Sequence, residues 1–192
     1  MLYKTNYHTH TTFCDGKNSP EEYITKAIEM DMKILGFSAH SMLSFNTSWH
    51  LPVNRHVEYV KEIQRLKEVY KDKLEILCGF EADYFPPVAM PDTCGFKEFS
   101  PDYIIGSVHF VTGDNLDDGC FTVDGPVEEI ENGIKTVFKG NEKKAVQTYF
   151  ATERAMLESG ASFDVMGHPD IIRKQNGKMH FFDENDGWYK RE

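Results

Sequence analysis

The sequence of 192 residues predicts an α/β fold in which parallel strands alternate with helices. Short apolar runs suited to buried strands take turns with longer amphipathic stretches suited to helices. Hydrophobic residues make up 40% of the chain and charged residues 27%, which is the balance of an ordinary globular domain. No stretch rich in Pro, Gly and Ser divides the chain, so we predict a single domain over residues 1–192.

The first predicted strand, residues 2–7, is followed by a helix with a marked beginning. Residues 19–22 read Ser-Pro-Glu-Glu, which places a capping serine, a proline in the first turn and a glutamate three residues after the cap. We expect this helix to extend to about residue 30. Residues 33–38 then form the second strand.

A second helix is predicted over residues 55–70, because apolar side chains recur every three residues while charged ones fill the other faces. The recurring apolar residues are Val57, Val60, Ile63, Leu66 and Val69. The remaining elements are strands at 74–80, 103–108 and 163–166 and helices at 127–138 and 142–159. This alternation is typical of α/β proteins with a parallel sheet.

Charge and hydropathy exclude several classes of function. The net charge of −10 repels nucleic acids and anionic membranes. No apolar run reaches the ~20 residues of a membrane span, and the N-terminus lacks an apolar signal-peptide core. The four cysteines form no C-x-x-C pair, which excludes a zinc knuckle. We therefore expect a cytoplasmic protein whose partner is a small phosphorylated metabolite, since bound cations reverse the field locally. Homo-oligomer formation stays open.

Side chains that can bind a metal follow every predicted strand. In strand order they are His8 and His10, His40, Glu81, His109 and His168. The carboxyl ends of the strands of a β/α barrel converge on one face, where sites in that fold are built. The sequence therefore predicts a metal centre at this face.

The spacing of the first ligands supports the metal centre. His8 and His10 lie on the same face of an extended segment, although an H-x-H alone also suits two solvent-facing histidines. Asp15 is a further candidate, and its alternative is a simple Asp-Gly turn. Glu81 ends a buried run, where a carboxylate is costly unless a cation or a hydrogen-bond donor meets it, and its two oxygens suit a bridging ligand. Mixed imidazole and carboxylate ligands suit Zn, Mn or Fe, and a cluster of this size indicates more than one divalent ion.

These residues lie in five short motifs. The motifs are His8-Thr9-His10, Ala39-His40-Ser41, Gly79-Phe80-Glu81, Gly106-Ser107-Val108-His109 and Gly167-His168-Pro169. Together they resemble the successive motifs of the PHP (polymerase and histidinol phosphatase) superfamily. The segments Phe80–Tyr84, Gly106–Val111 and Phe163–Lys174 resemble its histidinol-phosphate phosphatase branch more narrowly. The resemblance extends from Tyr7 to Lys174.

The resemblance implies a distorted β/α (TIM-like) barrel that hydrolyses L-histidinol phosphate to L-histidinol and phosphate in histidine biosynthesis. It implies one ion at His8, His10 and Glu81, a second at Glu81, His109 and His168, and a third at Asp15 and His40. It also implies that a metal-bound hydroxide attacks phosphorus, so no protein nucleophile is assigned.

The chain departs from the family pattern in two places. Ala39 precedes His40 where the family usually has an aspartate that could orient the histidine. After His168 no Asp-x-His pair follows, although the family ends with one on a late strand. Barrels of this kind need ~200 to 250 residues. We therefore expect a PHP domain that lacks its C-terminal strand-helix units, either as the N-terminal part of a longer protein or as a truncated form.

Three residues are weaker candidates for binding the substrate. Arg173 and Lys174 follow His168 and could meet a phosphate, Arg through a two-pronged contact and Lys as a point charge. Their alternative is a pair of solvated charges on a turn. His50 lies in a loop that could cover the site, and its alternative is a surface histidine.

Two other functions stay open. One is a different PHP-type phosphoesterase, including a nuclease, against which the charge of −10 and the lack of basic patches argue. The other is a non-catalytic metal-binding module, which the missing terminal motif favours.

Overall fold

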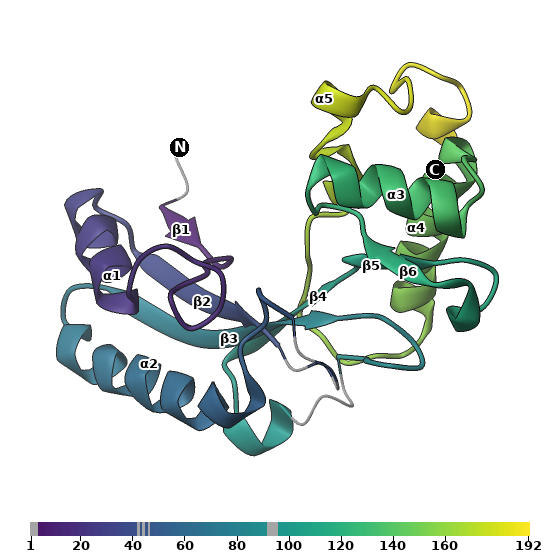
Figure 1. Cartoon of the computed structure of the whole chain (residues 1–192). Coiled ribbons are helices and arrows are strands. Elements are labelled where there is room, and N and C mark those ends of the chain that lie inside the picture. Colours follow the sequence, from purple (N-terminus) through teal and green to yellow (C-terminus); the bar gives the residue numbers. More distant parts are fainter. Residues whose placement is uncertain (1–3, 42, 44, 46, 92–95) are drawn as a thin grey trace. The chain divides into compact units, whose positions relative to one another are not determined.

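The computed structural model describes residues 4–41, 43, 45, 47–91 and 96–192, and it divides into two compact units (Figure 1). The first unit comprises Met1–Asp83, Pro87–Gly106 and Ser162–Val165, and the second comprises Tyr84–Pro86, Ser107–Ala161 and Met166–Glu192. Each unit is made of segments that are separated in the sequence. The single domain over residues 1–192 therefore stays a prediction.

Five strands form one sheet in the order β1-β2-β3-β4-β7. The strands are β1 (Thr5–Asn6), β2 (Ile34–His40), β3 (Glu75–Asp83), β4 (Tyr103–Ser107) and β7 (Val165–Met166). The β1–β2 and β2–β3 pairs are parallel, and His40 lies directly opposite Glu81. The spatial order follows the chain order, as in a β/α barrel, but the sheet stays open. The predicted fold class, α/β with a parallel sheet in barrel-like strand order, is confirmed.

Several strand boundaries differ from those predicted. Strands β2 and β3 run two to three residues further than expected, so His40 is the last residue of β2 and Glu81 lies within β3, two residues before its end. In contrast, β1 pairs over only two residues, and residues 2 and 3 of the predicted strand lie outside the described residues. The longer strands place the two side chains on rigid backbone.

Two helices accompany the sheet in the first unit, α1 (Pro20–Glu29) and α2 (His56–Tyr70). The predicted cap of α1 is confirmed, because the Ser19 hydroxyl accepts from the backbone N–H of Glu22 and the Glu22 carboxylate accepts from that of Ser19. Helix α2 runs along β3 (Figure 1).

The apolar stripe predicted for α2 is only partly buried. Ile63 and Leu66 are buried, whereas Val57 and Val69 are more than half exposed. A strict spacing of three residues advances by 300° per step on an α-helix and so drifts around the helix, because the true repeat is 3.6 residues. The central residues therefore face the sheet while the two ends of the stripe face solvent.

Two tyrosine hydroxyls form hydrogen bonds with backbone carbonyl oxygens of the first strand segments. The buried hydroxyl of Tyr59 donates to the carbonyl oxygen of Gly79 at 2.8 Å. The Tyr103 hydroxyl lies 3.0 Å from the carbonyl oxygen of Phe37 and 2.5 Å from that of Tyr7. A Cβ at Gly79 would come within 2.7 Å of the backbone oxygen of Tyr103, so only glycine permits this approach. These contacts fix the relative positions of the strands that lead to the site.

The second unit contains a hairpin that the sequence analysis did not predict, β5 (Phe110–Thr112) paired antiparallel with β6 (Cys120–Thr122). Its helices are α3 (Val127–Val137), α4 (Glu142–Glu158) and the short α5 (Asn176–Met179), with α3 against β6 and α4 against β5 (Figure 1). Short 3₁₀ turns occur at Val53–Arg55, Phe96–Phe99, Leu116–Asp118, Ile171–Arg173 and Tyr189–Arg191.

Among the described residues, no helix has both the length and the apolar character that crossing a membrane requires.

Candidate metal centre

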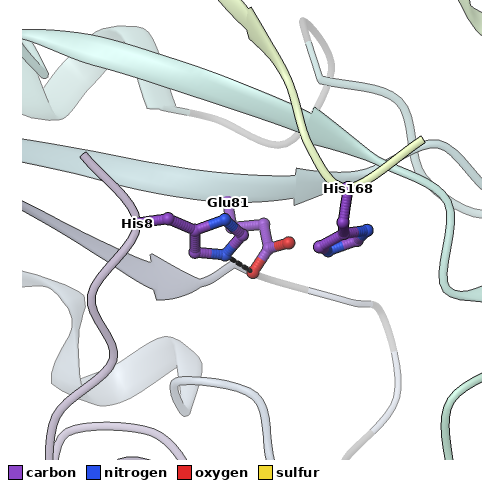
Figure 2. A group of neighbouring side chains, drawn as sticks. All are labelled: His8, Glu81 and His168. Carbon is purple, nitrogen blue, oxygen red and sulfur yellow. Dashed lines mark ion pairs between the residues drawn. The ribbon is translucent and has the colours of Figure 1, made fainter. Parts of the chain in front are cut away.

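Three imidazoles converge on one carboxylate oxygen in the first unit. Oε2 of Glu81 lies 2.9 Å from Nε2 of His8, the pair joined by the dashed line in Figure 2. The same oxygen lies 3.1 Å from Nε2 of His10 and 3.2 Å from Nδ1 of His40. Donor atoms that share one ion at ~2.0–2.1 Å lie about 3 Å apart, so these spacings suit ligation. The structure thus brings together four of the predicted ligands.

The sheet explains why these four side chains meet. Parallel pairing sets the ends of β2 and β3 side by side, and this register places His40 against Glu81. His8 and His10 follow the neighbouring strand β1 and differ by two positions, which directs both rings to the same side. Glu81 is 1% exposed. A carboxylate buried to this degree requires positive charge beside it.

Asp15 contacts the ring nitrogens of His10 and His40 that face away from Glu81. Its Oδ1 lies 3.3 Å from Nδ1 of His10, and its Oδ2 lies 3.8 Å from Nε2 of His40. Asp15 also sits in a tight turn, where Gly16 packs so closely that a Cβ would meet the His10 carbonyl oxygen at 2.3 Å. The turn at Asp15 is observed, and its role as a metal ligand, with which the turn is compatible, stays a prediction.

The pKa values of His10 and Asp15 show that this cluster favours positive charge. Burial alone would lower the pKa of His10, but hydrogen bonds to Asp15, Cys14 and Glu81 raise it to about 12. Burial opposes ionisation of Asp15 as well, yet the hydrogen bond from His10 and the nearby His40 lower its pKa to about 2. A proton on His10 stabilises the two carboxylates in the way that a divalent cation would. The imidazole and carboxylate donors of this cluster therefore suit a metal ion both in the charge that they stabilise and in the type of ligand atom.

Cys14 is a neighbour of the cluster that the sequence analysis did not select. Its Sγ lies 3.6 Å from Nδ1 of His10, and it forms a compact group with His10 and Asp15. The signal was its place directly before Asp15 in the same turn. The described cysteines, Cys14, Cys78 and Cys120, are free thiols.

An open pocket of about 580 Å³ adjoins His8, His10 and Asp15 in the first unit. Polar side chains on its wall include Lys17 and Lys26, and the rest of the wall is largely apolar. The volume is in the range of small-molecule sites. Space for a small ligand therefore lies directly beside the predicted ligands.

The second unit brings together the other two predicted imidazoles. His109 follows β4 and His168 follows β7, and their ring centroids are 4.9 Å apart. His109 is buried, and its carbonyl oxygen accepts from the backbone N–H of Val123. His168 is half-buried. The assignment of Glu81 with these two histidines to a second ion stays a prediction.

His50 is held inside the first unit by two side chains. Its Nε2 lies 2.8 Å from Oδ2 of Asp83 and its Nδ1 lies 2.6 Å from Oγ1 of Thr47. The side chain is buried, so the surface alternative is wrong. A direct contact of this imidazole with substrate would replace one of these partners.

Arg173 and Lys174 are exposed and paired with acidic side chains of the second unit. Arg173 donates to Asp170 at 2.7 Å and to Glu184 at 2.6 Å, and Lys174 donates to Asp124 at 2.9 Å. Exposed pairs of this kind contribute only about 0–1 kcal/mol each, so a phosphate could compete for these cations. Phosphate binding by the two residues stays a prediction.

Glu153 is a buried carboxyl group that the sequence analysis passed over. It lies on α4 and is 3% exposed, and burial raises its pKa from 4.5 to about 7 although His168 and His109 favour its charged form. Its position continues the buried series Val146, Tyr149, Met156 at helical spacing. An acidic residue within an apolar stripe was the signal that could have found it.

The chain is similar to known proteins over most of its length. The PHP domain family matches residues 6–191. The chain is 27% identical over 170 residues to a Deinococcus radiodurans protein named "Probable histidinol-phosphatase", a match that covers 87% of this chain and 60% of that protein. It is 25% identical over 176 residues to the histidinol-phosphatase of Lactococcus lactis, covering 89% and 58%. The chain thus spans about 60% of the length of these relatives.

Two solved structures share the fold. The hisK protein from Listeria monocytogenes matches with a TM-score of 0.72 and 24% identity, covering 91% of this chain and 70% of that one. Histidinol phosphate phosphatase from Lactococcus lactis, complexed with Zn, L-histidinol and phosphate, matches with a TM-score of 0.65 and 24% identity, covering 91% and 60%.

Proposed function

The chain belongs to the PHP domain family, and we propose that it is a metal-dependent phosphomonoester hydrolase whose substrate is L-histidinol phosphate. The observation that carries the proposal is the convergence of His8, His10 and His40 on one oxygen of Glu81. The names of the relatives, and the L-histidinol and phosphate in one structural neighbour, support the substrate.

The donor set indicates which residues would hold the ions. His8, His10 and Glu81 would hold one ion, and Asp15 with His40 another. Imidazole and carboxylate donors suit Zn, Mn or Fe. Divalent ions supply an activated water and neutralise the charge of the phosphoryl oxygens.

Asp15 has a second task in this proposal, which is to orient two imidazoles. By accepting from Nδ1 of His10 it leaves Nε2 of that ring directed at Glu81. It also lies beside Nε2 of His40, the histidine that Ala39 precedes in place of the usual aspartate. Asp15 would thus orient His40 in the absence of that aspartate.

A small monoester fits the charge and the space beside the ligands better than a polyanion. The net charge of −10 repels long nucleic acids. The pocket beside His8 and His10 has room for a small metabolite, and Lys17 and Lys26 offer positive charge on its wall. Arg173 and Lys174 are the further candidates for the phosphate.

The test is a comparison of substrates with the chain loaded with Zn or Mn. We expect hydrolysis of L-histidinol phosphate, weaker hydrolysis of p-nitrophenyl phosphate and none of a single-stranded oligonucleotide. Glu81→Ala should abolish turnover, whereas Glu75→Ala, an exposed position on the same strand, should not. Cleavage of the oligonucleotide alone would contradict the substrate class.

A non-catalytic metal-binding module is the second candidate. The donors around Glu81 suit metal binding by themselves and do not require turnover. Tight metal binding without hydrolysis of any phosphate ester would support this candidate over the first.

A further inference from the structure

We propose that Tyr149 and Glu153 form a positioning pair that fixes the imidazole of His168 for metal binding, acting through the backbone carbonyl of His168. The proposal rests on the proposed function and on the role of His168 as a metal ligand, which the family resemblance implies. It concerns three side chains of the second unit only.

A chain of short contacts connects the three residues. Oη of Tyr149 lies 2.7 Å from Oε1 of Glu153, one turn further along α4. The same Oη lies 3.1 Å from the carbonyl oxygen of His168. The backbone N–H of Ile171 also donates to this carbonyl, at 3.1 Å. The peptide that follows the His168 side chain is therefore held from two sides.

The segment that bears His168 depends on these contacts. Strand β7 ends at Met166, so His168 lies beyond the last residue that pairs in the sheet. Helix α4, in contrast, has 17 residues, and both Tyr149 and Glu153 are buried on it. A rigid helix thus supports a ligand on irregular backbone, as ligands with well-defined orientation require.

Counting protons determines the direction of the hydrogen bonds. The Tyr149 hydroxyl has one proton and cannot donate it to both Glu153 and the His168 carbonyl. A neutral Glu153 resolves the conflict, because its acid proton goes to Oη of Tyr149 and the tyrosine proton goes to His168. An ionised Glu153 would take the tyrosine proton and leave the carbonyl without this donor.

The surroundings of Glu153 support the neutral form. Its Oε2 is buried and has no hydrogen-bond partner among the described residues, which is costly for a carboxylate. Burial raises the pKa of Glu153 to about 7, although the hydrogen bond with Tyr149 and the charges of His168 and His109 favour its ionised form. The geometry and the burial therefore agree on the order Glu153, Tyr149, His168 for successive donors.

Binding of Co²⁺ to the purified chain tests the pair without an activity assay. We expect His168→Ala to reduce the number of ions bound, and Tyr149→Phe to weaken binding of the affected ion about 10-fold, as for other residues that orient metal ligands. The visible Co²⁺ spectrum should shift with Tyr149→Phe. Tyr70→Phe is the matched control, because Tyr70 donates to Glu21 at 2.9 Å on the exposed face of α2. This substitution should change neither the affinity for Co²⁺ nor the visible spectrum.

Two variants of Glu153 test the direction of donation. An amide can donate to Tyr149 as the neutral acid does, so Glu153→Gln should bind Co²⁺ within threefold of the wild type. Glu153→Leu cannot donate and should weaken binding about as much as Tyr149→Phe. The comparison of Glu153→Gln with Glu153→Leu tests whether Glu153 donates to Tyr149 even if Tyr149→Phe does not fold.

Three results would overturn the proposal. If His168→Ala lowers the stoichiometry while a folded Tyr149→Phe binds like the wild type, the positioning pair is wrong and the ligand assignment stands. If Gln and Leu at position 153 are equally damaging, the neutral donor is wrong. If His168→Ala leaves binding unchanged, both the ligand assignment and the pair fail.

Discussion

Nε2 of His50 lies 2.8 Å from Oδ2 of Asp83, and Asp83 is two residues beyond Glu81 on the same strand. Side chains in a strand alternate, so Asp83 and Glu81 share a face of the sheet. Both His50 and Asp83 are buried, and Thr47 takes the second ring nitrogen of His50. The pair fastens the segment before α2 to the end of β3, beside the predicted metal ligands.

Breaking this pair should strongly destabilise the fold. Asp83→Ala removes one member of a buried, hydrogen-bonded pair, and we expect a loss of about 3–5 kcal/mol in the free energy of unfolding. Urea unfolding of the metal-free protein measures this loss. Glu62→Ala, which breaks the exposed pair with Arg65 on α2, is the control and should cost less than about 1 kcal/mol. Equal effects of the two substitutions would mean that the buried pair contributes no more than a surface pair.

Glu153 should make stability fall as the pH rises. Burial raises its folded-state pKa from 4.5 to about 7, so between these values the folded chain holds a proton that the unfolded chain has released. Its contribution is fully present below pH 4.5 and is lost by about pH 7, a loss of roughly 3 kcal/mol. Urea unfolding across this range should show the loss in the wild type relative to Glu153→Gln. A difference between the two proteins that does not change with pH would refute the raised pKa.

Arg173 should affect substrate binding more than chemistry. Its exposed pairs with Asp170 and Glu184 are weak enough for a phosphate to replace. We expect Arg173→Ala to raise KM and to lower kcat/KM about 10- to 150-fold, since a two-pronged charged contact contributes about 1.5–3 kcal/mol. Steady-state kinetics with L-histidinol phosphate, beside Lys174→Ala, measures this. A wild-type KM in Arg173→Ala would show that Arg173 pairs with Asp170 and Glu184 and does not bind the phosphate.

Removing metal should lower thermal stability. An ion bound to the folded state at a free concentration of 100 times its Kd stabilises that state by about 2.7 kcal/mol. We expect chelation to lower the Tm and added Zn to restore it. His10→Ala, which loses the ring that contacts both Glu81 and Asp15, should show a much smaller response to Zn. An unchanged Tm after chelation of a metal-loaded sample would contradict stabilisation by the ion.

The sequence predicted the parallel strands and the four long helices because each has a local signal. The cap at Ser19, for example, marks the start of α1 exactly where the structure begins it. The hairpin of β5 and β6 was not predicted, because each strand has only three residues and is too short to show a periodic pattern. Its two ends, Phe110-Val111-Thr112 and Cys120-Phe121-Thr122, do carry β-forming residues on either side of a turn.

The first-unit ligands were predictable because position along the chain sets them. His40 ends β2 and pairs with Glu81 near the end of the neighbouring parallel strand β3, so their meeting follows from the strand order. The pairing of His50 depends on long-range packing that no local pattern reports, since Asp83 is 33 residues from His50. Of the two partners of Arg173, Asp170 is local and Glu184 lies 11 residues away. Glu153 was missed for a related reason, because its role depends on contacts of α4 with the chain around His168.

The metal content of Glu81→Ala tests the central claim most directly. The claim is that Glu81 collects His8, His10 and His40 around bound ions. Elemental analysis after dialysis against Zn should show at least one ion fewer per chain in Glu81→Ala than in the wild type. Glu75→Ala, on the exposed start of the same strand, should retain the full content. An unchanged metal content in a folded Glu81→Ala would contradict the account.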